Sequence, residues 1–229
     1  TKNSSQTRGG GIYAYSGTIT CNGIFRVDTN TCAASGGGIF VTGIGFSFTN
    51  VNVTGNVAGA SGGGICVNGG PCTLINANIT KDSAISGGGI YVTSGTLTFS
   101  TTASTIGGSV ADKNMATDGG GIYVNGGTVH FTIPPTISHN TASNNGGGVY
   151  SAGTTTINSA FTSNNNTAIN FGGGMYVAGT LNILGTPTII NNSAKGGGGI
   201  FYAASSSLTI GTAASPQNLI VKGNEATST

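Results

Sequence analysis

The chain has 229 residues, of which 43 are glycine and only 5% are charged. Seven basic and five acidic residues give a net charge of +2, so no basic platform for nucleic acid or an anionic membrane is expected. No apolar run approaches the roughly 18 residues that would cross a bilayer. The length fits one elongated repeat protein, and we expect a single domain over residues 1–229.

A block of three glycines followed by an apolar residue recurs every 25–32 residues along the chain. The apolar residues are Ile12, Ile39, Ile65, Ile90, Ile122, Val149, Met175 and Ile200. An asparagine or aspartate recurs in the same phase, at Asn3, Asn30, Asn56, Asp82, Asn114, Asn140, Asn166, Asn192 and Asn224. Most of these residues open an Asn-x-Ala motif. Two marks that repeat in phase predict a solenoid.

Three short strands are predicted in each repeat, in chain order. The first follows the glycines, as at Ile90–Val92, and the second follows a glycine turn, as at Thr96–Phe99. The third precedes the asparagine, as at Thr136–Ser138. Their alternation points Ile and Val inward, whereas β-branched residues and glycine oppose helix. We predict an all-β fold, a right-handed parallel β-helix of about nine triangular coils of about 26 residues.

Both repeat marks have a structural interpretation. Asparagine tolerates the left-handed conformation at a tight corner, and stacked asparagine amides can hydrogen-bond from coil to coil. The glycines allow a sharp corner or a close approach of two backbones. We therefore expect the asparagine row to be a structural ladder.

The alternation of Gly-Gly-Gly-Ile-Tyr-Val with Asn-x-Ala resembles the repeats of chlamydial polymorphic outer-membrane proteins and of bacterial β-helix adhesin passenger domains. The glycine motif recurs along almost the whole chain, and the Phe-x-x-Asn motif of those families has a match at Phe161–Asn164. The resemblance implies a surface-displayed right-handed β-helix that serves in adhesion or as a structural stalk.

The four cysteines form an even set without the spacing of zinc ligands. Cys66 and Cys72 flank a Gly-Gly-Pro turn, which favours a disulfide there. Cys21 and Cys32 are expected inside one coil, either as a second disulfide or as buried thiols. Paired cysteines and few charges favour an extracellular or cell-surface location. Possible N-glycosylation sequons begin at Asn3, Asn52, Asn78, Asn165 and Asn191.

A catalytic β-helix would need clustered carboxylates, often with a basic residue or calcium. Asp82 and Asp112 lie near the asparagine corner of consecutive coils, each beside a lysine, which is typical of a solvated, charge-balanced corner. Asp118 lies on the longest coil. We expect no enzyme, no cofactor and no metal site, and a polysaccharide lyase or hydrolase stays a distant alternative.

Two outward rows are candidate surfaces. The residue after each inward apolar residue predicts an exposed stripe, formed by Tyr13, Phe40, Cys66, Tyr91, Tyr123, Tyr150, Tyr176 and Phe201. It would either stabilise the stack or contact a subunit or sugar rings. Thr-x-Thr segments such as Thr18–Thr20 and Thr96–Thr98 resemble the ice-binding face of some antifreeze β-solenoids. His130 and Asn182 interrupt this row, and His130 and His139 are expected to be outward polar residues.

Neither end of the repeat shows a capping helix or a polar terminal coil, and open ends invite strand pairing. The leading hypothesis is a non-enzymatic extracellular structural protein, a subunit or segment of a surface fibre, stalk or sheath that assembles with itself end to end. The alternative is an adhesin that holds glycans or a host or cell-surface protein through the aromatic stripe. Ice binding is a further alternative, and we expect no nucleic-acid partner and no membrane insertion.

Overall fold

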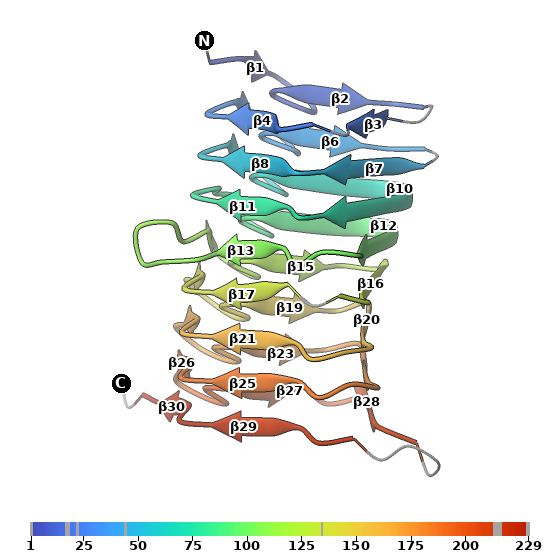
Figure 1. Cartoon of the computed structure of the whole chain (residues 1–229). Helices are drawn as coiled ribbons and strands as arrows, with labels where there is room; N and C mark the ends of the chain where they lie inside the picture. The colour runs from blue at the N-terminus through green and yellow to red at the C-terminus, as the bar shows by residue number, and fades with distance from the viewer. Residues whose placement is uncertain are drawn as a thin grey trace.

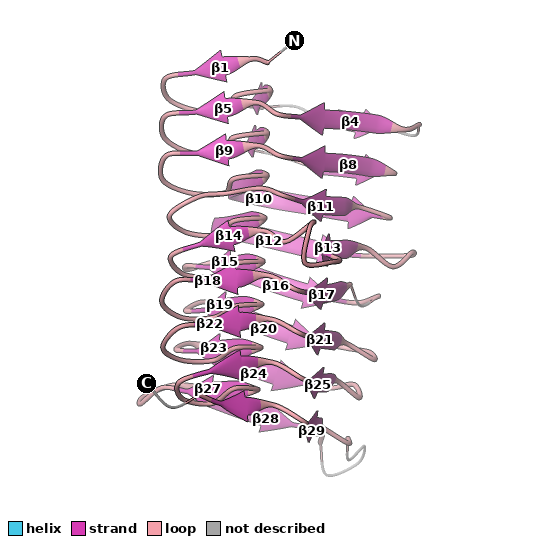
Figure 2. Cartoon of the chain, turned by 90° about the vertical axis from the view of Figure 1, so that its left-hand side faces the viewer, coloured by secondary structure: helices cyan, strands magenta, loops and turns pink. Residues whose placement is uncertain are grey.

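The computed structural model describes residues 2–16, 19–21, 23–43, 45–133, 135–212 and 217–227. Every regular element in these ranges is a β-strand, and all strand pairs are parallel (Figure 2). The strands stack into a solenoid along which the chain descends coil by coil (Figure 1). In Figure 1 the strands nearest the viewer run to the left while those behind run to the right, so the winding is right-handed. The predicted fold class is confirmed.

The widest sheet has 14 strands arranged in two columns, and we call it the wide sheet. Its first column follows the glycine blocks and contains β2 (Ile12–Ala14), β6 (Ile39–Val41), β15 (Ile122–Val124), β19 (Val149–Ser151), β23 (Met175–Val177) and β27 (Ile200–Tyr202). Its second column contains β3 (Ile19–Cys21), β7 (Phe46–Thr49), β16 (Thr128–Phe131), β20 (Thr154–Ile157), β24 (Thr180–Ile183) and β28 (Ser207–Ile210). Two longer strands, β10 (Ile65–Ile75) and β12 (Ile90–Phe99), run through both columns and join them.

The third predicted strand of each coil builds a separate sheet of eight strands, the narrow sheet. It contains β4 (Phe25–Asp28), β8 (Val51–Thr54), β11 (Asn78–Thr80), β13 (Thr105–Gly107), β17 (Thr136–Ser138), β21 (Thr162–Asn164), β25 (Thr188–Ile190) and β29 (Ile220–Lys222). A fourth segment, which the sequence did not predict, is a two-residue strand directly after each asparagine of the row. These strands form the corner sheet: β1 (Ser4–Ser5), β5 (Thr31–Cys32), β9 (Val57–Ala58), β14 (Met115–Ala116), β18 (Thr141–Ala142), β22 (Thr167–Ala168), β26 (Ser193–Ala194) and β30 (Glu225–Ala226). Ser83 bridges its two parts by pairing with Val57 and Met115.

The structure forms eight coils, where the sequence predicted about nine, because the nine residues of the asparagine row delimit eight intervals. Two of these intervals are longer than the rest. One is the interval from Asp82 to Asn114, where the segment between β13 and β14 protrudes as a loop from the side of the solenoid in Figure 1. The other is the interval from Asn192 to Asn224. The remaining coils keep a constant register, so equivalent residues lie directly above one another.

Inward side chains form one continuous apolar core along the solenoid axis. The rings of Phe99, Phe131 and Phe161 stack in succession, with centroids 5.4 Å and 4.8 Å apart. One coil carries polar residues inside: Ser151 and Thr155 are fully buried, and their hydroxyl oxygens lie 2.9 Å apart. Hydroxyl groups can therefore lie in this core where they have a hydrogen-bond partner.

Each glycine block serves both of the purposes that the sequence predicted. Its first residue turns the chain with a positive φ, as at Gly119, where φ is 65°. Its second and third residues lie against the backbone of the next coil. A Cβ added to Gly120 would stand 2.6 Å from the carbonyl oxygens of both Gly147 and Thr141. Only glycine fits between coils this closely spaced.

The asparagine row is a continuous hydrogen-bonded ladder inside the solenoid. The Asn114 side chain is fully buried, and its Nδ2 donates to Asn140 Oδ1 at 3.0 Å and to the carbonyl oxygen of Ile79 at 2.9 Å. The Asn114 backbone N–H donates to the same Oδ1 at 3.2 Å. Equivalent side-chain bonds link Asn3, Asn30, Asn56 and Asp82 in succession, and then Asn140, Asn166, Asn192 and Asn224. Between Asp82 and Asn114 the link is the Asp82 backbone N–H, which donates to Asn114 Oδ1 at 3.0 Å. The predicted ladder is confirmed, and each amide satisfies backbone groups that the corner would otherwise leave buried without a partner.

Candidate functional surfaces

The aromatic stripe lies in direct register along the first column of the wide sheet. The rings of Tyr91, Tyr123, Tyr150, Tyr176 and Phe201 stack on one another, with successive centroid distances of 5.2, 4.4, 4.6 and 5.2 Å. The predicted exposure is only partly correct. Tyr13 is 45% exposed, the stacked rings are half-buried, and Phe40 is buried at 3%.

Two features of the fold cover the stripe. The first glycine of each block packs against the ring-bearing residue, so that a Cβ on Gly119 would lie 2.9 Å from Tyr123 Cβ. The residues just before the glycines flank the rings: the Arg8 guanidinium lies 5.1 Å from the centroid of the Phe40 ring. Because the stacked rings occupy each other's faces, few faces are left for sugar rings. This geometry favours the structural interpretation of the stripe.

A polar cluster lies beside the stacked tyrosines. Asp118 Oδ1 accepts hydrogen bonds from Asn144 Nδ2 and from the backbone N–H of Asn145, both at 3.0 Å. Burial, followed by the neighbouring tyrosines and the Asp118 charge, raises the pKa of Tyr123 above its usual range. The pKa of Tyr150 is raised as well, first by burial. A tyrosine in this setting stays a neutral phenol and is no general base at neutral pH.

The structure separates the two acids that the sequence placed at one corner. Asp82 is fully buried in the asparagine ladder, so its predicted solvation is wrong. Asp112 lies on the surface and pairs with Lys81, whose Nζ is 3.1 Å from Asp112 Oδ1. A hydrogen bond from Ser109, followed by the Lys81 ammonium, lowers the pKa of Asp112. Asp82 points inward because it occupies the ladder position, which is an asparagine in all the other coils.

The histidines lie on different sheets of one coil. His130 is on the outward face of β16, as predicted, between Thr98 and Thr156. His139 follows β17 at a corner with a φ of 59°. Its Nδ1 is buried without a hydrogen-bond partner among the described residues, so this side chain is not simply an outward polar group. Neither histidine lies in an arrangement with the described acids that would make a catalytic dyad.

The cysteines are free thiols in the described structure, so both predicted disulfides, Cys21–Cys32 and Cys66–Cys72, are wrong. Cys66 occupies the outward stripe position between Phe40 and Tyr91, whereas Cys72 points into the core with Phe46 and Leu97. Two side chains on opposite faces of one strand cannot be bridged. Cys21 and Cys32 belong to the wide and corner sheets, respectively. Burial raises the pKa of the Cys66 and Cys72 thiols to about 12.

The second column of the wide sheet presents hydroxyl groups outward in two rows. Thr96, Thr128, Thr154, Thr180 and Ser207 stand in register in one row. The adjacent row contains Thr20, Ser47, Thr73, Thr98, His130, Thr156, Asn182 and Thr209, while Thr18 lies outside the described residues. No strand of the wide sheet carries an Asp, Glu, Lys or Arg residue. The face is therefore flat, repetitive and free of permanent charge.

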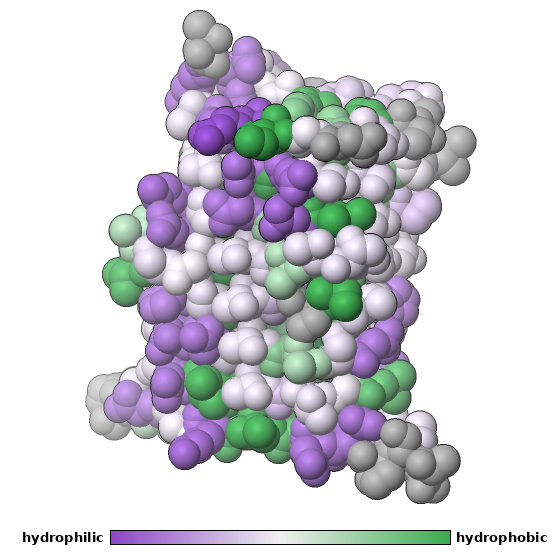
Figure 3. Space-filling model, viewed as in Figure 1, coloured by the Kyte–Doolittle hydropathy of each residue, from purple (hydrophilic) through white to green (hydrophobic). Residues whose placement is uncertain are grey.

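The possible glycosylation sites fall at two kinds of position. Asn52 and Asn78 face outward from adjacent strands of the narrow sheet, directly opposite each other. With Arg26 they belong to a shallow polar depression in the upper part of the narrow sheet, where hydrophilic side chains gather in Figure 3. Asn165 and Asn191 occupy left-handed corner positions with φ values of 55° and 54°. Asn3, the fifth, is exposed at the first coil.

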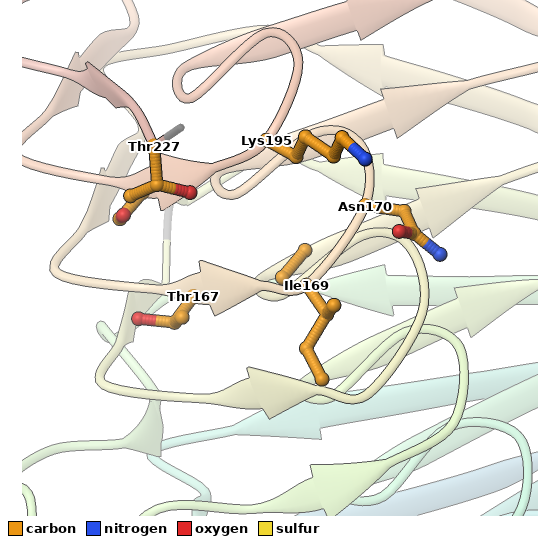
Figure 4. Close-up of a pocket in the computed structure, with 7 residues that line it drawn as sticks. Thr167, Ile169, Asn170, Lys195 and Thr227 are labelled. Carbon is orange, nitrogen blue, oxygen red and sulfur yellow. The ribbon is translucent and has the colours of Figure 1, made fainter. Parts of the chain in front are cut away.

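A further shallow pocket lies over β22 and β26 (Figure 4). It is lined by Thr167, Ala168, Ile169, Asn170, Ser193, Lys195 and Thr227. Lys195 is the one ionisable side chain in this lining, and no carboxylate, thiol or imidazole lies beside it. The pocket has no pair of groups for acid–base or nucleophilic chemistry.

The described residues bring no three His, Cys, Asp or Glu side chains together in a way that could hold a metal ion. They also include no helix suited to crossing a membrane. No protein-family model, curated protein or solved structure matches the chain, so its resemblance to β-helix adhesins rests on the sequence motifs.

Proposed function

We propose that the chain is a non-enzymatic structural solenoid, a subunit or segment of an extracellular surface fibre, stalk or sheath that continues end to end. The observation that carries this proposal is the apolar edge of the last coil. Leu208, Ile210 and Val221 occupy core columns, in register with Leu181, Ile183 and Ile189, yet they are 43–48% exposed. A further coil, from the same polypeptide or from another copy, would bury them.

The first coil presents the matching edge. Ile12, Ile19 and Phe25 also occupy core columns and are only half-buried, and Ile19 stands in the column of Leu208. The two edges are compatible because every coil between them has the same register. Stacked copies would make a heterologous contact that does not close, and such a contact produces a fibre.

In-register stacking has one geometric requirement. If Ile12 of one copy pairs with Ile200 of another, Asn3 of the first copy would have to occupy the ladder position that Asn224 of the second copy already holds. Strands β1 and β30 would then occupy one position, so one of them must move aside. Both are only two residues long, and most of their residues are exposed, so the displacement disrupts few contacts. Removing residues 224–229 is expected to promote assembly.

Sedimentation velocity of a matched pair of variants tests the proposal. Leu208→Lys places a charge in the exposed core column, while Thr209→Lys places the same charge on the outward face of the same strand. We expect the wild-type and Thr209→Lys chains to assemble at micromolar concentration and the Leu208→Lys chain to stay monomeric. Monomers of both the wild-type chain and the chain without residues 224–229 would contradict end-to-end assembly.

A second function is favoured by the hydroxyl rows of the wide sheet, namely binding of ice. Threonine has a stiff χ1, and rows about 4.8 Å apart repeat the same hydroxyl and methyl groups at fixed spacing. Charged side chains, which would disturb an ordered layer of water, do not occur on the strands of this sheet. A rigid, uncharged lattice of this kind suits a crystalline surface better than a flexible partner.

An assay of ice recrystallisation tests the second function. We expect inhibition by the wild-type chain and its loss when Thr128 and Thr154, on the hydroxyl face, are both replaced by Lys. The matched control replaces Thr136 and Thr162, an equivalent pair in adjacent strands of the narrow sheet, with Lys. Equal inhibition by both double variants, or none by the wild-type chain, would reject ice binding by this face.

A further inference from the structure

One rung of the asparagine ladder is an acid, Asp82. In the neighbouring rungs each Nδ2 donates both to the next Oδ1 and to a backbone carbonyl of the narrow sheet. Asn56 reaches the Val27 carbonyl at 2.8 Å, and Asn114 reaches the Ile79 carbonyl at 2.9 Å. Because β4, β8 and β11 are adjacent, the carbonyl between these two is that of Val53. The repeat assigns this carbonyl to residue 82, which has no amide to offer it.

Only one oxygen of the Asp82 carboxyl group has a partner. Asp82 Oδ1 accepts from the Asn56 backbone N–H at 2.7 Å and from Asn56 Nδ2 at 3.0 Å, as an asparagine Oδ1 would. Asp82 Oδ2 stands in the place of the amide nitrogen and is buried with no hydrogen-bond partner. The two groups that an amide would reach from there, Asn114 Oδ1 and the Val53 carbonyl, are both acceptors. Asn114 Oδ1 accepts the Asp82 backbone N–H at 3.0 Å, but no side-chain donor lies between these three oxygens, which is costly in a buried site.

The backbone of the preceding coil lies close to Asp82 Oδ2, and no basic side chain approaches it. A Cβ added to Gly64 would lie 2.6 Å from Asp82 Oδ2, so the glycine backbone closes the site on that side. The charged group whose field reaches Asp82 is Asp28, at the end of β4, and it is another acid. Lys81, the neighbour in sequence, turns to the surface and pairs with Asp112. Strands β8, β9 and β14, which run beside the ladder here, carry no charged residue.

We propose that Asp82 is protonated in the folded chain and donates a hydrogen bond within the ladder, as an asparagine amide would. The stability of the solenoid then depends on pH through this one rung. Burial, the largest cause, raises the pKa of Asp82 well above the usual carboxyl value, in line with this geometry. In the unfolded chain the same carboxyl group ionises near pH 4. The contribution of Asp82 to stability is therefore fully present below about pH 4 and is lost as the pH rises through the raised pKa of the folded state.

Denaturant unfolding of the full chain between pH 4 and pH 9 tests the proposal. We expect the wild-type midpoint to fall with rising pH, while Asp82→Asn, which completes the ladder, removes most of that fall. Asp112→Asn is the matched control, because it removes an acid of the neighbouring surface and should preserve the wild-type fall. An unchanged slope in Asp82→Asn would overturn the proposal.

Two further measurements keep the result unambiguous. Infrared difference spectra of the folded chains at neutral pH should show a protonated carboxylic acid band that is lost in Asp82→Asn and kept in Asp112→Asn. Adding Ca²⁺ or a chelator should leave the wild-type midpoint unchanged. No acid band at neutral pH, or a midpoint that rises with Ca²⁺, would show that the site does not hold a proton.

Discussion

The Oδ1 atom of Asn166 accepts two hydrogen bonds from Asn140, one from its Nδ2 at 3.1 Å and one from its backbone N–H at 2.9 Å. Asn140 Nδ2 also donates to the carbonyl oxygen of Ile106 at 3.0 Å. One side chain thus holds three consecutive coils together, because Asn114 above it donates to Asn140 Oδ1. We expect the ladder to contribute more to stability than a surface amide does.

Replacing Asn140 with Ala tests the ladder. The change removes the acceptor of the buried Asn114 backbone N–H and the side-chain donor to the Ile106 carbonyl, while Asn114 Nδ2 keeps its bond to the Ile79 carbonyl. Each buried group left without a partner costs about 1–3 kcal/mol. We expect the free energy of unfolding to fall by about 2–5 kcal/mol in urea titrations. Asn125→Ala, at an exposed asparagine outside the ladder, should change it by less than about 0.5 kcal/mol. Equal losses in the two variants would contradict the role of the ladder.

Replacing Gly120 with Ala tests the close approach of the coils. The new methyl group would lie 2.6 Å from two carbonyl oxygens, and backbone atoms cannot move aside as a flexible side chain can. We expect a loss of at least about 2 kcal/mol, or failure to fold, in thermal unfolding followed by circular dichroism. Gly23→Ala is the control, since a Cβ there meets nothing within 4 Å. A Gly120→Ala chain as stable as the Gly23→Ala chain would show that the coils can separate without cost.

The tyrosine stack is predicted to be stabilising through its rings rather than through its hydroxyl groups. Tyr123 stacks on Tyr91 and Tyr150, and an aromatic pair contributes about 0.5–1.5 kcal/mol beyond its buried area. Tyr123→Leu should therefore lower the free energy of unfolding by about 1–3 kcal/mol, whereas Tyr123→Phe should stay within about 1 kcal/mol of the wild type. A greater loss for Phe than for Leu would point to the hydroxyl group instead.

The four cysteines are predicted to react as thiols, not as disulfides. Cys66 and Cys72 are buried, and burial raises the pKa of both thiols, so they stay protonated and inaccessible at pH 8 and a thiol reagent should label them slowly in the folded chain. In denaturant without a reducing agent, all four should react at once. A reducing agent should leave the unfolding midpoint unchanged, and a fall in the midpoint would reveal a disulfide.

Much of the fold was predictable because two marks repeat in phase. The glycine blocks fixed the coil length, and the asparagines fixed the register, so the inward columns followed from alternation alone. The corner sheet was not predictable, since a strand of two residues such as Thr141–Ala142 carries no period. The buried hydroxyls of Ser151 and Thr155 were also missed, because a Thr-Thr-Thr run has no apolar pattern.

The functional residues were harder to predict than the fold. Sequence spacing brought Cys66 near Cys72, but the register shifts of β10 between Val67 and Pro71 turn them to opposite faces. Asp82 resembled a surface acid because Lys81 precedes it. The signal that could have placed it inside was available: it occupies the phase of the asparagine row, whose members between the two end coils, Asn30 to Asn192, are all buried.

Electron microscopy of the wild-type and Leu208→Lys chains at micromolar concentration tests the central proposal most directly. Eight coils at about 4.8 Å per rung give a unit roughly 40 Å long. We predict unbranched filaments of the wild-type chain, with an axial repeat close to that length, and isolated rods of the Leu208→Lys chain. End-to-end assembly would be contradicted if the wild-type chain and the chain without residues 224–229 both stay as isolated rods at every concentration, like the Leu208→Lys chain.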